Sequence, residues 1–179
     1  MGLITVGIAD CKVSSDPRDV LITRGLGSCV AVLLYDPVAK VAGLLHYMLP
    51  ESNLDADKAI MRPCMYADTG IPLLLRRSYR LGALKSRSIF MAAGGARMLE
   101  KNETFNVGKR NCDALRTMFH RAGIILHKED IGGTASRTIQ IDVARGKVHL
   151  TRSAGSRQEM VVDLKKIGVG DVTQPTHPS

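Results

Sequence analysis

Two residues in this sequence have types and surroundings suited to covalent catalysis, and the first is a cysteine that opens an apolar stretch. Cys29 follows GLGS at positions 25–28, and two glycines at this spacing allow a tight backbone turn. Backbone N–H groups that converge at such a turn lower the pKa of a thiol and hold an oxyanion. Cys29 is therefore a candidate nucleophile, with a buried core cysteine as the alternative.

The second residue is His46, which stands in the otherwise apolar sequence GLLHYMLP at positions 43–50. A buried histidine needs a polar partner, and an adjacent thiol is one that would activate a nucleophile. If the apolar stretches on either side of Asp36-Pro37 pair as a hairpin, their outer ends bring Cys29 and His46 together. A core histidine bonded to a backbone carbonyl is the alternative.

Other chemistries lack their motifs. A dinucleotide-binding loop would require glycine where Val30 stands, and no G-x-x-x-x-G-K-[ST] sequence occurs. The four cysteines are widely spaced without a C-x-x-C pair, so the common zinc spacings are missing. We predict no metal site, and we expect free thiols with structural roles outside Cys29, at Cys11, Cys64 and Cys112.

The composition limits the classes of partner. Hydrophobic residues make up 45% of the 179 residues and charged residues 23%, which excludes wholesale disorder. The net charge of +8 favours an anionic partner. Aromatic residues are only 4%, there is no Trp, and the basic residues are scattered, which argues against a nucleic-acid partner. Without a basic leader or an apolar run of ~20 residues, we expect a cytoplasmic protein without direct membrane insertion.

These candidate residues must be positioned by strands and helices that interleave without a regular rhythm. The expected strands are 20–23, 29–35, 40–48, 88–93, 124–127 and the hairpin 138–143 with 147–151, and the expected helices are 67–81 and 106–122. This order predicts the α+β class: a layered single domain with mixed β-sheets flanked by helices. We expect the domain to span 1–167 and to be followed by a flexible C-terminal tail, 168–179.

Several stretches together carry a family resemblance. TRGLGSCVAVLLYDP at 23–37, followed by GLLHYMLP at 43–50, resembles the CheD family of chemoreceptor glutamine deamidases. Further matches are YAD at 66–68, AGGA at 93–96, FNVGKRN at 105–111 and DIGG at 130–133 before Arg137. The resemblance extends over about residues 20–152. It departs from the family at 134–136, where TAS replaces the usual Asn and Gly.

The resemblance implies an enzyme that hydrolyses particular glutamine side chains of bacterial chemoreceptors to glutamate and ammonia. Cys29 matches the family's nucleophile, His46 its catalytic base and Thr23 the third, orienting member of the site. The turn that contains Gly27 and Ser28 would supply the N–H groups that hold the oxyanion. The family fold is α+β and is related to bacterial toxin deamidases.

The same resemblance sets expectations for cofactors and partners. The chemistry requires no metal and no organic cofactor, and it would also suit glutamyl methyl esters as a side activity. The expected partners are the chemoreceptor as substrate and a phosphatase of the CheC type. The alternative function is a non-catalytic adaptor that binds receptors or CheC, but an adaptor has no reason to keep Thr23, Cys29 and His46 together.

Overall fold

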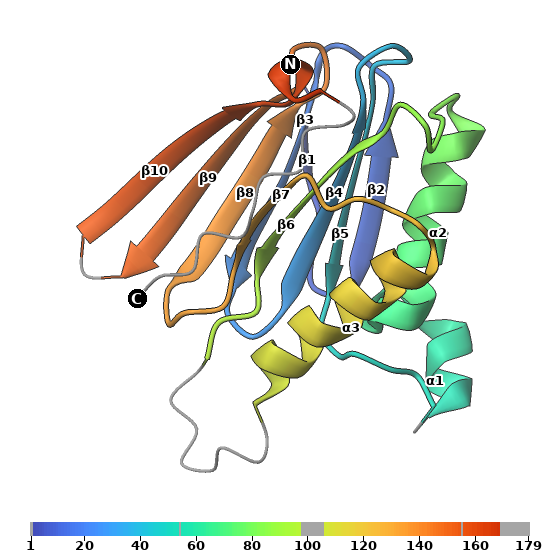
Figure 1. Cartoon of the computed structure of the whole chain (residues 1–179), viewed down its shortest axis with the longest axis vertical. Helices are drawn as coiled ribbons and strands as arrows, with labels where there is room; N and C mark the ends of the chain where they lie inside the picture. Colours follow the sequence, from blue (N-terminus) through green and yellow to red (C-terminus); the bar gives the residue numbers. More distant parts are fainter. Residues whose placement is uncertain (1, 54, 98–105, 155, 169–179) are drawn as a thin grey trace.

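The computed structural model consists of two five-stranded sheets and a layer of helices (Figure 1). It describes residues 2–53, 55–97, 106–154 and 156–168. The predicted α+β class with layered, mixed sheets is confirmed. The predicted tail lies outside the described residues apart from Gly168.

The first sheet has the order β1-β3-β8-β9-β10. Its strands are β1 Gly2–Thr5, β3 Asp19–Leu26, β8 Ser136–Asp142, β9 Lys147–Ala154 and β10 Ser156–Asp163. Strand β1 is parallel to β3, and the other neighbours are antiparallel. The predicted hairpin is confirmed as β8 and β9, which pair from Ser136 opposite Ser153 to Asp142 opposite Lys147.

The second sheet has the order β2-β5-β4-β6-β7. Its strands are β2 Asp10–Ser14, β4 Val30–Asp36, β5 Val41–Tyr47, β6 Ile89–Gly94 and β7 Lys128–Ile131. Strands β6 and β7 are parallel and the other pairs are antiparallel. Every residue of β4, β5 and β6 is buried, because one face packs on the first sheet and the other on helices.

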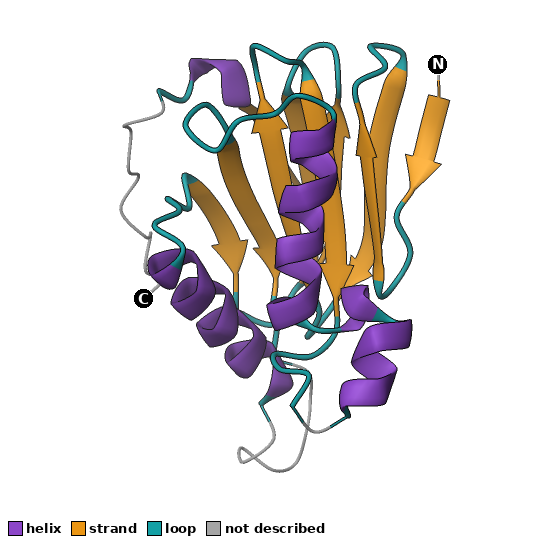
Figure 2. Cartoon of the chain, turned by 90° about the vertical axis from the view of Figure 1, so that its right-hand side faces the viewer, coloured by secondary structure: helices purple, strands orange, loops and turns teal. Residues whose placement is uncertain are grey.

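Two long helices cover the outer face of the second sheet (Figure 2). They are α2, Ala67–Arg80, and α3, Val107–Arg121, while the short α1, Ala56–Met61, lies beside one end of the sheet. Helix α3 begins at the N-cap Asn106, whose side chain accepts the Lys109 N–H at 3.0 Å. Short 3-10 turns occur at Pro63–Met65 and Leu164–Lys166. Within the described part of the chain, no helix is long and apolar enough to cross a membrane.

The β4–β5 hairpin is closed by Asp36, whose side chain is fully buried. Its carboxylate accepts the N–H groups of Val38 and Ala39 inside the turn, and Arg87 pairs with it at 2.8 Å. These bonds fix the turn and therefore the register of the two strands. Ala31 consequently lies opposite His46.

The prediction of a strand at residues 124–127 is wrong. The N–H of Ile124 donates to the Phe119 carbonyl at 2.8 Å, which holds the start of this apolar run in the C-terminal cap of α3. The strand begins only at Lys128. Four further elements were not predicted, because none of them has a continuous apolar run long enough to indicate a strand or helix: α1, β1, β2 and β10.

Candidate active site

The candidate residues Thr23, Cys29 and His46 belong to the segments where β3 and β5 end and β4 begins, and these strand ends lie at the lower end of the molecule in Figure 1. Side chains alternate along a strand, and the even-numbered Ala42 and Leu44 of β5 pack in the core between the two sheets, so His46 points the same way. Cys29, two residues before Ala31, packs against the same core. The structure therefore brings the three predicted residues to one end of one layer.

Thr23 and His46 are joined by a buried hydrogen bond of 2.8 Å between Thr23 Oγ1 and His46 Nδ1. The threonine hydroxyl has a single hydrogen, and it donates this to the Val6 carbonyl at 2.7 Å. Oγ1 must therefore accept from the imidazole, which places the ring proton on Nδ1. The geometry selects the tautomer in which Nε2 carries a free lone pair.

The free lone pair of His46 is buried and has no hydrogen-bond partner among the described residues. Burial lowers the pKa of His46 from 6.5 to about 4, because the protein interior disfavours the imidazolium. The side chain is therefore neutral at physiological pH. A neutral imidazole with an unpaired, inward-facing nitrogen is equipped to accept a proton.

Cys29 is the partly exposed cysteine, whereas the other three are buried, and all four are free thiols as predicted. The expectation of a lowered thiol pKa is wrong. Burial raises the pKa of Cys29 above its usual value of 9.0, and the opposing effect of its own backbone N–H is smaller. The resting site therefore holds a neutral thiol and a neutral imidazole.

The three consecutive carbonyls from Gly27 to Cys29 all accept hydrogen bonds. The Gly27 carbonyl accepts the Ala96 N–H at 2.8 Å, and the Cys29 carbonyl accepts the Gly95 N–H at 2.8 Å. Between them, the Ser28 carbonyl accepts Nδ2 of Asn111 at 2.9 Å. The candidate nucleophile thus lies on a loop in which these hydrogen bonds fix the orientation of three successive peptide groups.

Only part of the predicted oxyanion turn keeps its N–H groups available. The Gly27 N–H already donates to the Gly25 carbonyl at 3.0 Å, and Gly25 adopts the predicted turn with φ of 70°. Within the described chain, the N–H groups of Ser28 and Cys29 donate to no backbone carbonyl. The set of candidate oxyanion donors therefore narrows to these two.

Glycine in the AGGA sequence has a steric reason. Gly94 has φ of 114°, and a Cβ built on it would collide with the carbonyl of Cys29. Any side chain at this position would therefore push the loop away from strand β6. The match at 93–96 reflects this close approach.

The DIGG match at 130–133 contains a buried ion network. Asp130 on β7 is buried between Arg137 on β8 and Arg152 on β9, at 3.1 and 2.8 Å, so the ion network links both sheets. Arg137 also donates to the Gly132 carbonyl at 2.7 Å. The departure at 134–136 lies in this β7–β8 connection, whose shape is set by the arginine.

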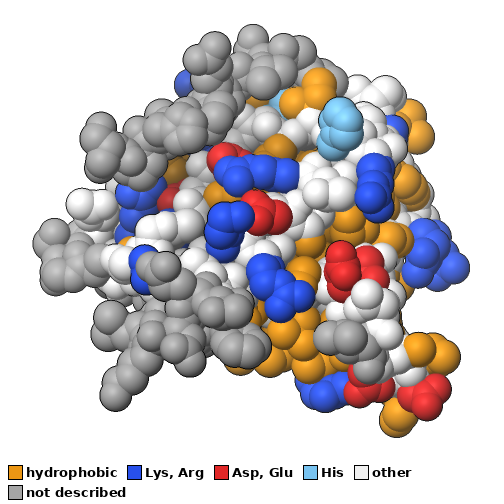
Figure 3. Space-filling model, turned by 60° about the horizontal axis from the view of Figure 1, so that its bottom comes forward, with side chains coloured by type: hydrophobic (Ala, Val, Ile, Leu, Met, Phe, Trp, Pro, Cys, Tyr) orange, Lys and Arg blue, Asp and Glu red, His pale blue; other side chains and the backbone are white. Residues whose placement is uncertain are grey.

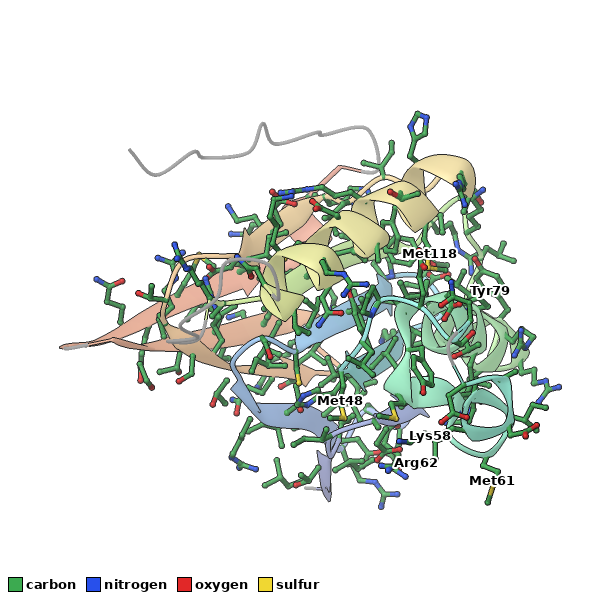
Figure 4. All side chains as sticks on the ribbon, turned by 90° about the horizontal axis from the view of Figure 1, so that it is seen from below. Met48, Lys58, Met61, Arg62, Tyr79 and Met118 are labelled. Atoms are coloured by element: carbon green, nitrogen blue, oxygen red, sulfur yellow. The ribbon has the colours of Figure 1, made fainter. Side chains whose placement is uncertain are left out.

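The end face that carries the site has side chains of both charge signs interspersed (Figure 3). Met48, two residues after His46, lies near the middle of the end-on view, whereas Met61 projects at its edge (Figure 4). A hollow of about 460 Å³ lies between α3 and residues 50–53, and its lining does not include the three candidate residues. No cluster of three or more His, Cys, Asp or Glu side chains occurs within metal-binding reach in the described ranges.

Two contributors were missed from the sequence. Val6 acts through its carbonyl, so its residue type carries no signal of the contact with Thr23. Asn111 is the last residue of the FNVGKRN match at 105–111. Its position in that match is the only sequence feature that could have indicated a role near the site.

Comparisons with known proteins decide the family. A family model described as CheD chemotactic sensory transduction matches residues 48–152. The "Probable chemoreceptor glutamine deamidase CheD 1" of Syntrophus aciditrophicus is 46% identical over 160 residues, 89% of this chain and 100% of that protein. The chain belongs to the CheD family.

Other CheD relatives have similar coverage. The "Probable chemoreceptor glutamine deamidase CheD" of Solibacter usitatus is 44% identical over 168 residues, which are 94% of this chain and 99% of that protein. The protein of the same name from Pyrococcus abyssi is 40% identical over 156 residues, 86% of this chain and 94% of that protein. The resemblance to CheD seen in the sequence is thereby confirmed.

The environment of Cys29 predicts its alkylation behaviour. Iodoacetamide should label Cys29 faster than the three buried cysteines, because reagent reaches it, with a pH midpoint above 9 because burial raises its pKa. Peptide mapping after brief labelling between pH 6 and 10.5 measures both. A midpoint below 8, or equal labelling of all four thiols in folded protein, would contradict this description.

Proposed function

We propose that this CheD protein hydrolyses glutamine side-chain amides of chemoreceptors to glutamate with release of ammonia. The observation that carries the proposal is the hydrogen-bond chain from the Val6 carbonyl through Thr23 to His46, which leaves Nε2 as a free base in the layer that also holds Cys29. Relatives of this chain bear the name chemoreceptor glutamine deamidase. In this proposal Cys29 is the nucleophile, His46 the general base and Thr23 the orienting residue.

The reaction starts from neutral partners. As Cys29 Sγ attacks the glutamine Cδ, His46 Nε2 takes the thiol proton, so no stable thiolate needs to exist beforehand. Sγ and Nε2 form no hydrogen bond in this structure. Catalytic contacts of this kind commonly tighten only when substrate binds.

The remaining steps use the same groups. The tetrahedral oxyanion is held by the N–H groups of Ser28 and Cys29. The imidazolium of His46 then gives its proton to the departing nitrogen, so that ammonia leaves and a thioester remains. Neutral His46 next removes a proton from water, which attacks the thioester. As the C–S bond breaks, the imidazolium returns this proton to the departing sulfur, so glutamate, the free thiol and neutral His46 result.

Burial acts in opposite directions on the two halves of this cycle. It lowers the pKa of His46, which makes the imidazole a weaker base toward the thiol but makes the imidazolium a stronger acid toward the leaving nitrogen. Thr23 accepts from Nδ1–H in both charge states and keeps the ring oriented. The same machinery would hydrolyse a glutamyl methyl ester, with methanol as the leaving group.

The partner side of the proposal is a receptor substrate reached in the cytoplasm, with a phosphatase of the CheC type as a further partner. Mass spectrometry of a chemoreceptor co-expressed with this protein tests the function. Hydrolysis replaces NH2 by OH, so modified peptides should gain about 1 Da at glutamine positions. A receptor that is bound but never gains mass would favour the non-catalytic adaptor instead.

A further inference from the structure

The side chain of Asn111 connects α3 to the two chain segments that carry Cys29 and His46. Its Nδ2 donates to the carbonyl of Ser28 at 2.9 Å and to that of Met48 at 2.8 Å. Two carbonyl acceptors require the amide nitrogen at this position, because an amide oxygen has no hydrogen to donate. Asn111 is fully buried, so water does not compete for these bonds.

The bond to Ser28 fixes the direction of a neighbouring N–H. The Ser28 carbonyl and the Cys29 N–H belong to one peptide, which is trans, so the two groups point in opposite directions. The carbonyl points to Asn111 on the outer helix layer. The Cys29 N–H therefore points away from the helices, toward the inter-sheet side where the proposed chemistry occurs.

The bond to Met48 ties the second strand to the same point. Met48 follows His46 by two residues and lies directly after the last pair of the β4–β5 register, in which Tyr47 is opposite Val30. One amide group thus holds the end of the strand that carries the base and the loop that carries the thiol. A displacement of either segment would lengthen one of the two bonds.

We propose that Asn111 is a positioning residue that aims the Cys29 N–H at the oxyanion and keeps the Cys29 loop aligned with His46. This inference rests on the cysteine chemistry of the proposed function. It extends that function by assigning a role to α3. Among the described residues, Asn111 is the one side chain of α3 that bonds to the carbonyls of residues 27–29.

The identity of the residue matters at this place. The flanking carbonyls of Gly27 and Cys29 are held by backbone N–H groups, which any residue supplies. The Ser28 carbonyl is held by a side chain, so its orientation is lost when that side chain changes. The Oδ1 atom has no partner among the described residues, so the two carbonyls account for the polar contacts of the Asn111 side chain.

The test compares two reactions of the same thiol in purified protein. Acylation of Cys29 by p-nitrophenyl acetate passes through an oxyanion, whereas alkylation by iodoacetamide is a displacement at carbon that develops none. In Asn111→Asp, which is nearly isosteric but lacks the N–H donors, acylation should slow about 10- to 100-fold. Alkylation should change by less than about threefold, so the ratio of the two rates falls.

Two further variants separate positioning from folding. Asn111→Ala removes the donors without placing a charge in the interior, and it should lower the same ratio. Tyr47→Phe removes a buried hydrogen bond of 2.7 Å from the Tyr47 hydroxyl to the Asn111 backbone carbonyl, but leaves the amide side chain in place. This control should lower the melting temperature and leave the ratio unchanged.

The possible results are distinct. If both Asn111 variants keep the wild-type ratio, or if Tyr47→Phe lowers it equally, the positioning role is wrong and Asn111 only stabilises the fold. If the ratio falls as expected but wild-type protein never deamidates a receptor, the inference stands for the thiol chemistry and the proposed substrate fails.

Discussion

Replacing Cys29 by alanine should abolish deamidation while the protein remains folded. The proposed nucleophile is the partly exposed thiol, and its removal leaves no covalent route to the thioester. We expect the rate to fall by at least about 10⁴-fold, to the detection limit of the receptor mass measurement. Because Cys29 is not fully buried, loss of one sulfur atom should cost little stability.

Cys112→Ala is the matched control for this experiment. The Cys112 Sγ lies 4.0 Å from the carbonyl of Gly95, whose N–H holds the Cys29 carbonyl, so the variant disturbs packing behind the same loop. It should lower the melting temperature but keep the rate within about threefold, since a buried cysteine acts as a small hydrophobic residue. Retained deamidation by Cys29→Ala, or its loss in Cys112→Ala at full folding, would refute the assignment of the nucleophile.

The central hairpin was predictable because its signals are local. Residues 29–35 and 40–48 form apolar runs of strand length on either side of Asp36-Pro37, and they became β4 and β5 within one residue at each end. The carboxylate of Asp36, bonded to turn N–H groups, reinforces this choice. The relation between Cys29 and His46 follows from that register, so the candidate pair could be found from the sequence.

The edge of the sandwich could not be predicted in the same way. Strand β1 alternates between exposed and partly buried residues, and β10 is partly exposed on the sheet edge, so neither has a clear apolar run. Strand β1 is held by pairing with β3, which is distant in sequence, and β10 by pairing with the β9 strand that directly precedes it. The local pattern of β1 carries no information on so distant a partner.

The electrostatics of the site also required the structure. The glycine turn in the sequence predicts backbone N–H groups near Cys29, which favours a lowered thiol pKa. How deeply the Cys29 side chain is buried cannot be read from the sequence. In the fold, burial outweighs the N–H effect and raises that pKa, and it lowers that of His46. The tautomer of His46 depends on the backbone carbonyl of Val6, and the residue type at position 6 does not reveal this contact.

Replacing His46 by glutamine should slow deamidation about 10²- to 10⁴-fold, the usual contribution of a positioned general base. In the wild type, activity should depend on pH through the neutral form of His46. Its pKa of about 4 places the acid limb of kcat/KM near pH 4, with activity lost as pH falls through that value. Rates measured between pH 3.5 and 8, with folding checked by circular dichroism, test this.

The same pKa makes a prediction for stability with a definite sign. His46 titrates near 4 when folded and near 6.5 when unfolded, so the unfolded chain binds more protons between these values. The free energy of unfolding should be fully retained above pH 6.5 and lost progressively toward pH 4, by on the order of 3 kcal/mol. Urea melts of the wild type and His46→Gln should show this loss in the wild type and a smaller one in the variant.

Thr23 variants separate the base from the residue that orients it. Thr23→Val removes the acceptor of the His46 Nδ1–H while keeping the shape of the side chain, so the buried proton loses its partner. We expect kcat to fall about 10- to 100-fold, and Thr23→Ser, which keeps the hydroxyl, to recover most of it. For the pH dependence predicted above, an acid limb of kcat/KM near pH 6.5 in the wild type would mean that His46 is solvated or charged in the working enzyme. Equal kcat in Thr23→Val and wild type would mean that the tautomer fixed by Val6 and Thr23 has no part in catalysis.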